Sequence, residues 1–226
     1  MRMPRDHQTA NSGIIDLALY NRLLSSRGGL VLLKSSLSWD VVDLCLCNPM
    51  TGACTFPPDA TLEADAYVLV TCNDLSPSEP DDMAVGTQII AVKSEYNDSN
   101  TTLQYQHFSS TSSNGAGSWG PVMRSGEFKE HLIVSVDRGR EVVCGDTIYW
   151  LGYSIRTIVP AHSVAAMDMR TGETRTVDLP KEHWIKNGFV WRVLATTSDG
   201  RLSLLGNDRK MGKSDYIQVW VHIKGE

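Results

Sequence analysis

The stretch Cys47-Asn48-Pro49-Met50-Thr51-Gly52-Ala53-Cys54-Thr55-Phe56-Pro57 decides the fold class, because it returns later in a second form. That form is Met167-Asp168-Met169-Arg170-Thr171-Gly172-Glu173-Thr174-Arg175-Thr176-Val177-Asp178-Leu179-Pro180. Each reads as a strand, an Asn or Asp, two residues, Thr-Gly, a second strand and a proline. Asn48 and Asp168 can bind the backbone two residues on, and Gly52 and Gly172 can take the positive φ of a tight turn. Both stretches therefore predict β-hairpins.

The spacing of these hairpins favours a repeated architecture. Gly52 and Gly172 are 120 residues apart, which is three units of 40, and four-stranded propeller blades repeat about every 40 to 50 residues. Asp199-Gly200 is a third turn between two apolar runs. Every residue from Leu44 to Cys47 is apolar, as expected for a strand covered on both faces. The sequence predicts an all-β, incomplete, kelch-like β-propeller of about four to five blades.

Strand signals extend over most of the chain. Runs rich in Val, Ile, Leu, Thr and Tyr, bounded by turn residues, predict strands at 30–34, 42–47, 67–71, 88–93, 102–109, 132–136, 141–143, 147–152, 163–168, 175–178, 191–196, 202–206 and 216–222. No helical window separates them, which excludes alternating βα architectures. One helix is expected, where apolar residues recur at helical spacing from Ile14 to Leu24. The predicted organisation is a disordered leader over 1–13, a connector helix over 14–27 and a propeller-like domain over 28–226.

Composition bounds the function classes. The chain has 226 residues, with 21 Lys and Arg against 26 Asp and Glu and a net charge of −5. This balance argues against a nucleic-acid partner, since that affinity depends on clustered cations. The five cysteines are odd in number and lie mostly in apolar runs, so they are expected to be reduced core residues of a cytoplasmic or nuclear protein. No stretch approaches the ~20 apolar residues of a membrane span, so no membrane partner is expected.

Motifs for catalysis or cofactor binding lack their usual context. Gly115-Ala116-Gly117-Ser118-Trp119-Gly120 matches the dinucleotide pattern, but that motif needs a strand before it and a helix after it. A Ser/Thr run precedes it and Pro121 follows, which favours a loop. The six histidines form no pair at metal-binding spacing. We expect no cofactor, no metal and no catalytic residue.

Tryptophans supply the candidate binding residues. Trp39, Trp119 and Trp184 lie next to turn residues or charges and could protrude as interface anchors, which are enriched in Trp and Arg. Arg124 lies near Trp119, and His183 precedes Trp184, so we expect these five residues to contact a partner. The alternative is that a loop Trp folds back to cover the blade beneath it, because large aromatic side chains are buried on average.

Four motifs together resemble a known family. They are Gly28 to Leu33, Leu46 to Gly52 with Phe56-Pro57-Pro58, Val143 to Leu151, and Asp168 to Pro180. In this order they look like the F-box-associated, kelch-like propeller region of plant F-box proteins, particularly the large grass families. The resemblance covers roughly Ser25 to His222. A helix near Ile14–Leu24 looks like the family's connector to the propeller, whereas no recognisable F-box is present.

The resemblance implies a non-catalytic substrate-recognition module of an SCF-type ubiquitin ligase, with an unknown protein as substrate. A Skp-type adaptor is implied as a partner only if an F-box precedes this chain. Two alternatives stay open. One is a degenerate copy or decoy that binds targets without coupling to the ligase. The other is a small-molecule-binding or enzymatic propeller, which three titratable groups from different blades would support.

Overall fold

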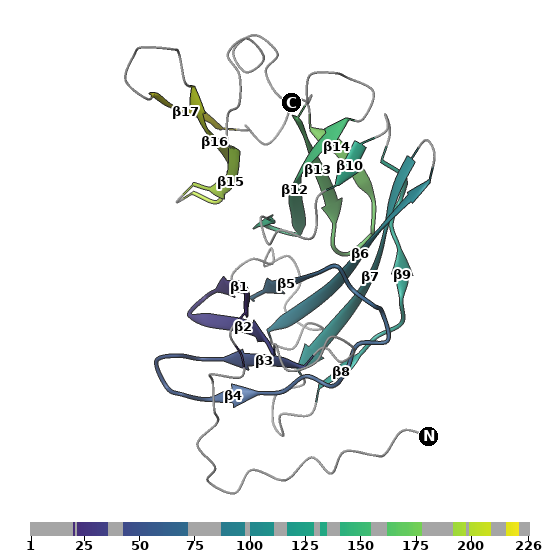
Figure 1. The fold of residues 1–226 in the computed structure, drawn as a ribbon, viewed down its shortest axis with the longest axis vertical. Coiled ribbons are helices and arrows are strands. Elements are labelled where there is room, and N and C mark those ends of the chain that lie inside the picture. Colours follow the sequence, from purple (N-terminus) through teal and green to yellow (C-terminus); the bar gives the residue numbers. More distant parts are fainter. Residues whose placement is uncertain are drawn as a thin grey trace, which may run out of the picture.

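The computed structural model describes an all-β protein, as predicted (Figure 1). Within the described ranges, every regular element is a strand and no helix occurs. Those ranges are residues 20, 22–35, 43–71, 87–97, 100–110, 117–128, 132–134, 141–154, 162–177, 192–197, 199–208 and 216–221.

The strands form four antiparallel sheets, named here in chain order. The first sheet contains β1 (Arg22–Arg27), β2 (Leu30–Lys34), β3 (Leu44–Cys47) and β4 (Cys54–Thr55). The second contains β5 (Ala66–Val70), β6 (Gln88–Asn97), β7 (Asn100–Ser110), β8 (Gly117–Trp119) and β9 (Met123–Arg124). The third contains β10 (Leu132–Val134), β11 (Val142–Cys144), β12 (Thr147–Ser154), β13 (His162–Asp168) and β14 (Thr174–Val177). The fourth contains β15 (Arg192–Thr196), β16 (Leu202–Asp208) and β17 (Tyr216–Val221).

Each sheet is essentially a meander in which successive strands are neighbours. The exceptions are two edges at which a pair of short strands takes the place of one long strand. β8 and β9 both pair with β7, and β10 and β11 both pair with the same edge of β12. Neighbouring sheets also contact each other: β1 contacts β5, β7 contacts β10, and β11 contacts β15. The described part of the fold is therefore a series of short antiparallel meanders packed in chain order.

Alternate side chains of the second sheet enter two different cores. The core shared with the first sheet contains Leu32, Leu44, Leu46, Leu62, Tyr67, Leu69, Ile89, Ala91 and Phe108. The core shared with the third sheet contains Ala66, Val68, Val70, Ile90, Val92, Leu103, Tyr105, Phe128, Val143, Ile148, Trp150, Ala165, Met167 and Met169. Because neighbouring residues of a strand point to opposite faces, both faces of the second sheet are covered.

The third sheet is covered on both faces in the same way. Ala165 and Met167 face the second sheet, while their neighbours Val164 and Ala166 pack with Leu194, Leu202 and Leu204 of the fourth sheet. Sequential stacking therefore explains why β5 and β13 have no polar alternation.

The N-terminal helix prediction is wrong where the structure can test it. Arg22–Arg27, the end of the predicted connector helix 14–27, forms β1 and pairs with β2. Gly28 and Gly29, with φ of 56° and 78°, make the two-residue hairpin turn between these strands, a geometry that strongly favours glycine. Pairing with β2 thus overrides the helical spacing of the apolar residues. The leader 1–13 and residues 14–19 of the helix lie outside the described residues.

The predicted repeat length also needs correction. The turns containing Gly52 and Gly172 join the third and fourth positions of the first and third sheets, so their separation spans two sheets and not three units of 40. The sheets begin at Arg22, Ala66, Leu132 and Arg192. The longer spacing arises partly from the extended β6–β7 hairpin. The part of the chain that the structure describes forms four sheets, and the count of four to five propeller blades stays a prediction.

The two related turns have the same hydrogen bonds. Asn48 Oδ1 accepts from Met50 N at 3.0 Å and Thr51 N at 3.3 Å; Asp168 Oδ1 accepts from Arg170 N and Thr171 N, both at 2.9 Å. Gly52 and Gly172 have φ of 72° and 70°. In the third predicted turn, Gly200 N donates to Thr197 O at 2.9 Å, and the Asp199 carboxylate accepts a hydrogen bond from the Thr197 hydroxyl.

The surroundings of these two turns differ. A Cβ on Gly172 would lie 2.4 Å from the Tyr105 hydroxyl of the second sheet, whereas nothing lies within 4 Å of a Cβ on Gly52. The carbonyl of Gly172 also accepts from Gly126 N at 3.0 Å. The Asp168–Gly172 turn therefore holds the third sheet against the second.

We predict that Gly172→Ala lowers the free energy of unfolding much more than Gly52→Ala. Both variants force alanine into positive φ, at about 1 kcal/mol, but only Gly172→Ala adds overpacking of about 1 to 3 kcal/mol. Urea denaturation of both variants measures the difference. Tyr105→Phe removes the clashing oxygen and should recover part of the loss in the Gly172→Ala background. Equal losses for the two alanines would contradict this account.

Candidate functional site

The structure describes two of the five residues expected to bind a partner. Trp119 lies at the end of β8 and Arg124 at the end of β9, on the outer edge of the second sheet. Trp39, His183 and Trp184 lie outside the described residues. Trp119 pairs with Phe108 and Arg124 with Gln104, so the two are about 13 Å apart along β7.

Trp119 folds back onto the sheet, which is the alternative considered from the sequence. Its indole Nε1 donates to the carbonyl of Pro58 at 2.6 Å. Its ring lies 5.3 Å from that of Phe108 and 6.5 Å from that of Tyr67. Trp119 therefore connects the chain after β4 to the second sheet.

Two glycines and a buried glutamine shape this edge. Gly117–Trp119 is strand β8 and not the loop expected from the glycine-rich motif. A Cβ on Gly117 would lie 2.2 Å from the Phe108 ring, so close packing explains this glycine. The Gln106 amide is 2% exposed and donates to Thr61 Oγ1 at 2.8 Å and Gly120 O at 2.7 Å. Leu62 N donates to its carbonyl oxygen at 3.2 Å.

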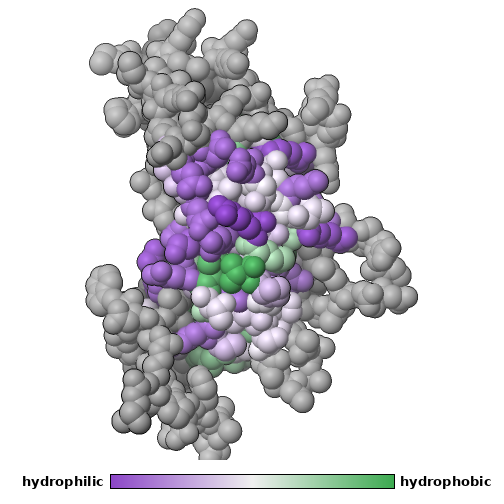
Figure 2. Space-filling view, turned by 90° about the vertical axis from the view of Figure 1, so that its right-hand side faces the viewer, coloured by the Kyte–Doolittle hydropathy of each residue, from purple (hydrophilic) through white to green (hydrophobic). Residues whose placement is uncertain are grey.

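The edge bulges outward between β8 and β9. Gly120 N donates to His107 O, whereas Met123 pairs with Tyr105. The edge strand therefore advances by three residues where β7 advances by two, and the extra residue forms a β-bulge. Val122 lies in this bulge and is 45% exposed. Figure 2, which faces the β7 and β9 side of the molecule, shows hydrophobic surface bordered by hydrophilic side chains.

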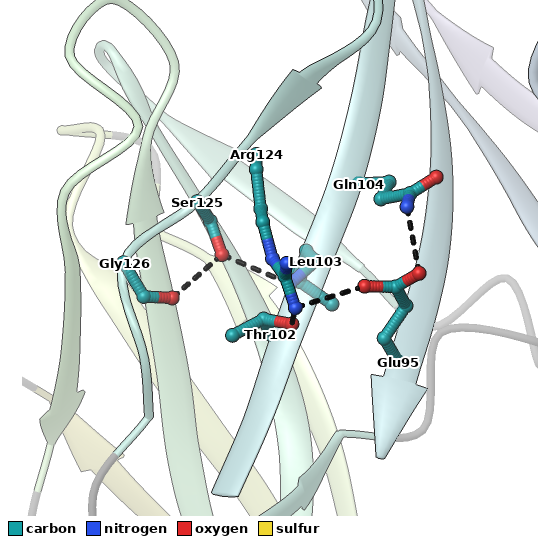
Figure 3. A network of polar contacts seen from close by, with 7 residues as sticks. All are labelled: Glu95, Thr102, Leu103, Gln104, Arg124, Ser125 and Gly126. Atoms are coloured by element: carbon teal, nitrogen blue, oxygen red, sulfur yellow. Dashed lines mark hydrogen bonds and ion pairs between the residues drawn. The ribbon is translucent and has the colours of Figure 1, made fainter. Parts of the chain in front are cut away.

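Arg124 is held in a polar network beyond the bulge (Figure 3). Its Nη2 lies 3.1 Å from a Glu95 carboxylate oxygen and donates to Thr102 Oγ1 at 3.1 Å. Gln104 Nε2 donates to the other Glu95 oxygen at 2.6 Å. The Arg124 side chain remains 57% exposed. We call Glu95, Thr102, Gln104, Val122 and Arg124 the β9 surface.

The β9 surface continues a face that is buried further along the same strands. On β6, Ile89 and Ala91 enter the core shared with the first sheet, and Glu95 follows on the same face. On β7, Phe108 and Gln106 are buried, and Gln104 and Thr102 follow. The face thus changes from apolar to polar where the first core ends. What remains outside that core includes a preorganised guanidinium and, two residues before it in the chain, an exposed valine.

A second polar cluster lies between the first and third sheets. Arg27 of β1 reaches β11, where its Nη2 donates to Val143 O at 2.6 Å. Glu141, just before β11, accepts a hydrogen bond from the Ser25 side chain and lies near the positive charge of Arg27. Its Oε2 is buried without a hydrogen-bond partner. The cluster joins β1 and β11, the strands at which the first and third sheets approach each other.

Burial controls the charge of Glu141. Desolvation raises the pKa of this carboxyl to about 7, against an ordinary value of 4.5 and despite the opposing effects of its own backbone, Ser25 and Arg27. At neutral pH the pair is therefore a guanidinium beside a half-protonated carboxyl. This pair brings together titratable groups from two sheets.

We predict that Glu141→Gln changes how stability depends on pH. The folded state holds the Glu141 proton more tightly than the unfolded state, so wild-type stability falls as pH rises from about 4.5 to about 7. Glu141→Gln removes this loss and should gain about 1 to 3 kcal/mol relative to wild type between pH 4.5 and pH 8. Urea unfolding across pH measures the gain. Glu63→Gln, at an exposed ion pair with Lys93, is the control, and an equal gain there would refute the assignment.

The comparisons with known proteins give a family but no characterised relative. A family model described as a domain of unknown function (DUF7595) matches residues 3–224. The search of curated proteins and that of solved structures found no match. Of the elements the structure describes, none is a helix of the length and apolar character needed to cross a membrane. Within the same residues, no three His, Cys, Asp or Glu side chains are placed to hold a metal ion.

Proposed function

The chain belongs to the DUF7595 family, and we propose that it is a non-catalytic protein-binding module that captures its partner at the β9 surface. The observation that carries this proposal is the state of Arg124. Its guanidinium is fixed by Glu95 and Thr102 yet more than half exposed, two residues after the exposed Val122.

Preorganisation favours this surface as a binding site. An arginine already held in one conformation loses little side-chain entropy when a partner docks. Arginine is also enriched among the residues that dominate binding energy. An exposed ion pair contributes only about 0 to 1 kcal/mol to folding, so stability alone gives little reason for the network. A partner offering carboxylates or carbonyls around an apolar side chain would complement the free N–H groups and Val122.

The ubiquitin-ligase role is the more specific form of this proposal. It rests on the resemblance of the four sequence motifs to F-box-associated propeller regions, and the stacked antiparallel sheets agree with that fold. In this form the β9 surface binds an unidentified protein substrate. A Skp-type adaptor would bind only an F-box preceding this chain. Co-purification with that adaptor separates a receptor from a decoy that binds targets without recruiting the ligase.

We predict that Arg124→Glu abolishes partner capture. A photoreactive phenylalanine analogue placed at Val122 of the full chain would crosslink the partner in cell extract, and the added charge reversal at Arg124 should reduce this product at least tenfold. Arg201→Glu is the matched control, since Arg201 is an exposed arginine paired with Asp199 at 2.7 Å on the fourth sheet. Circular dichroism verifies that both variants fold.

Four outcomes would count against the proposal, and the first three concern the Val122 crosslink itself. These three are a crosslinked product that persists in Arg124→Glu, an equal loss of that product in Arg201→Glu, and the absence of any specific product with the analogue at Val122. A product identical to that obtained with the analogue at Val193, an exposed residue of β15, would also show that the β9 surface is not selective.

A further inference from the structure

Three cysteines share one face of the first sheet. Cys45 and Cys47 lie two residues apart on β3, and Cys54 begins β4. Cys47 is directly opposite Cys54 in the antiparallel register. This face points away from the core shared with the second sheet, which takes the alternating residues Leu44 and Leu46. All three thiols are free.

The hydrogen bonds of the hairpin define the kind of pair that Cys47 and Cys54 form. Asn48 N donates to Ala53 O at 2.8 Å and Asn48 O accepts from Gly52 N at 2.8 Å, so the hydrogen-bonded position beside the turn has Asn48 opposite Gly52 and Ala53. Antiparallel pairs alternate, which makes Cys47 and Cys54 a non-hydrogen-bonded pair, with Cα atoms about 4.5 Å apart and side chains at their closest. A disulfide requires Cα atoms about 4.4 to 6.8 Å apart. This pair therefore suits a disulfide without movement of the backbone.

The electrostatic environment of the thiols agrees with this register. A hydrogen bond with Cys54 is the main cause that raises the pKa of Cys47, followed by burial. Burial is the main cause that raises the pKa of Cys45 to about 12, followed by the charge of Cys54, a hydrogen bond with Cys54 and the charge of Cys47. The three sulfur atoms therefore interact directly. Cys45 and Cys47 are buried, and Cys54 is partly exposed.

We propose that Cys47 and Cys54 form a redox-modification site, in which a two-electron oxidant such as hydrogen peroxide joins them in a reversible disulfide across β3 and β4. This inference is independent of the proposed binding function. The partly exposed Cys54 is the sulfur that the oxidant reaches, and Cys47 is the sulfur that completes the bond.

The chemistry balances in two steps. The Cys54 thiolate attacks one peroxide oxygen and becomes a sulfenic acid, while the other oxygen leaves as hydroxide and takes up the thiol proton to form water. The Cys47 sulfur then attacks the Cys54 sulfur, and the sulfenic hydroxyl leaves with the Cys47 proton as a second water. Two thiols are oxidised to one disulfide and one peroxide is reduced to two waters. A small dithiol or glutathione reverses the change by exchange.

Cys45 also forms a side-chain hydrogen bond with Cys54, but the strand register favours Cys47 as the bridging partner. Cys45 is diagonal to Cys54, and diagonal neighbours in an antiparallel pair lie about 7 to 8 Å apart, beyond the usual disulfide range. It is also fully buried, and its main-chain neighbours on β4 do not bring a sulfur directly opposite it. The disulfide would close the Asn48–Ala53 turn, whose tip carries Met50, 89% exposed.

The test is to count thiols in the full chain after mild oxidation. Folded wild-type protein is treated with a small excess of hydrogen peroxide and then with an alkylating reagent, and its mass is measured by mass spectrometry. Two of its five cysteines should resist alkylation until a dithiol is added. Cys47→Ser and Cys54→Ser should each prevent this loss. Cys45→Ser, Cys72→Ser and Cys144→Ser should leave it unchanged. The oxidised wild type should melt about 2 to 6 °C higher than the reduced protein.

Several results would overturn the proposal. These are a loss of two thiols that survives Cys54→Ser, a bridge that requires Cys45, Cys72 or Cys144, and disulfide-linked dimers in place of an internal bond. If a serine variant does not fold, peptide mapping of the oxidised wild type decides instead. The bond must then link a fragment containing Cys47 to one containing Cys54.

Discussion

The structure depends on covering both faces of its two inner sheets. A strand that is apolar on both faces is stable only between two other layers, because burial of apolar surface is the main favourable term in folding. β5 and β6 send odd and even residues into separate cores, and β12 and β13 do the same one sheet later. The order of the sheets therefore follows from the order of the chain, and each sheet covers one face of the next sheet.

The β9 surface is a consequence of the same constraint. The β6–β7 hairpin extends beyond the core shared with the first sheet, and its face becomes polar where that core ends. Trp119 and Gln106 belong to the buried part, where they connect the chain between the first two sheets to β7 and β8. Arg124 belongs to the projecting part and stays exposed. One face of one hairpin thus serves packing at one end and is available for binding at the other.

The sequence predicts the fold class well because its signals are local. Short strand runs and Asx-Gly turns determine their own hydrogen bonds, and the side chains of Asn48 and Asp168 form the contacts expected of them. β1 was mistaken for helix because its apolar spacing fits a helix, although Gly28-Gly29 between two apolar runs was a hairpin signal. The repeat length was wrong because connection lengths are not constrained by strand chemistry.

The candidate site was only partly predictable, for a physical reason. Trp119 and Arg124 were both named from their neighbours in sequence, but the tertiary surroundings decide which of them is covered. Pro58, Tyr67 and Phe108 cover Trp119. The Arg27–Glu141 pair was missed because its members are far apart in the chain and meet only through sheet stacking. The Cys47–Cys54 pair, in contrast, was implicit in the hairpin, since equal distances from the turn place the two residues opposite each other.

Alanine substitution at two adjacent isoleucines of β6 tests the stacking of sheets most directly. Ile89 packs toward the first sheet and Ile90 toward the third, and both are fully buried. We predict that Ile89→Ala and Ile90→Ala each lower the free energy of unfolding by about 2 to 5 kcal/mol, measured by urea denaturation. A loss below about 1 kcal/mol at either position would mean that one face of the second sheet is exposed, and would contradict a fold built from sheets stacked in chain order.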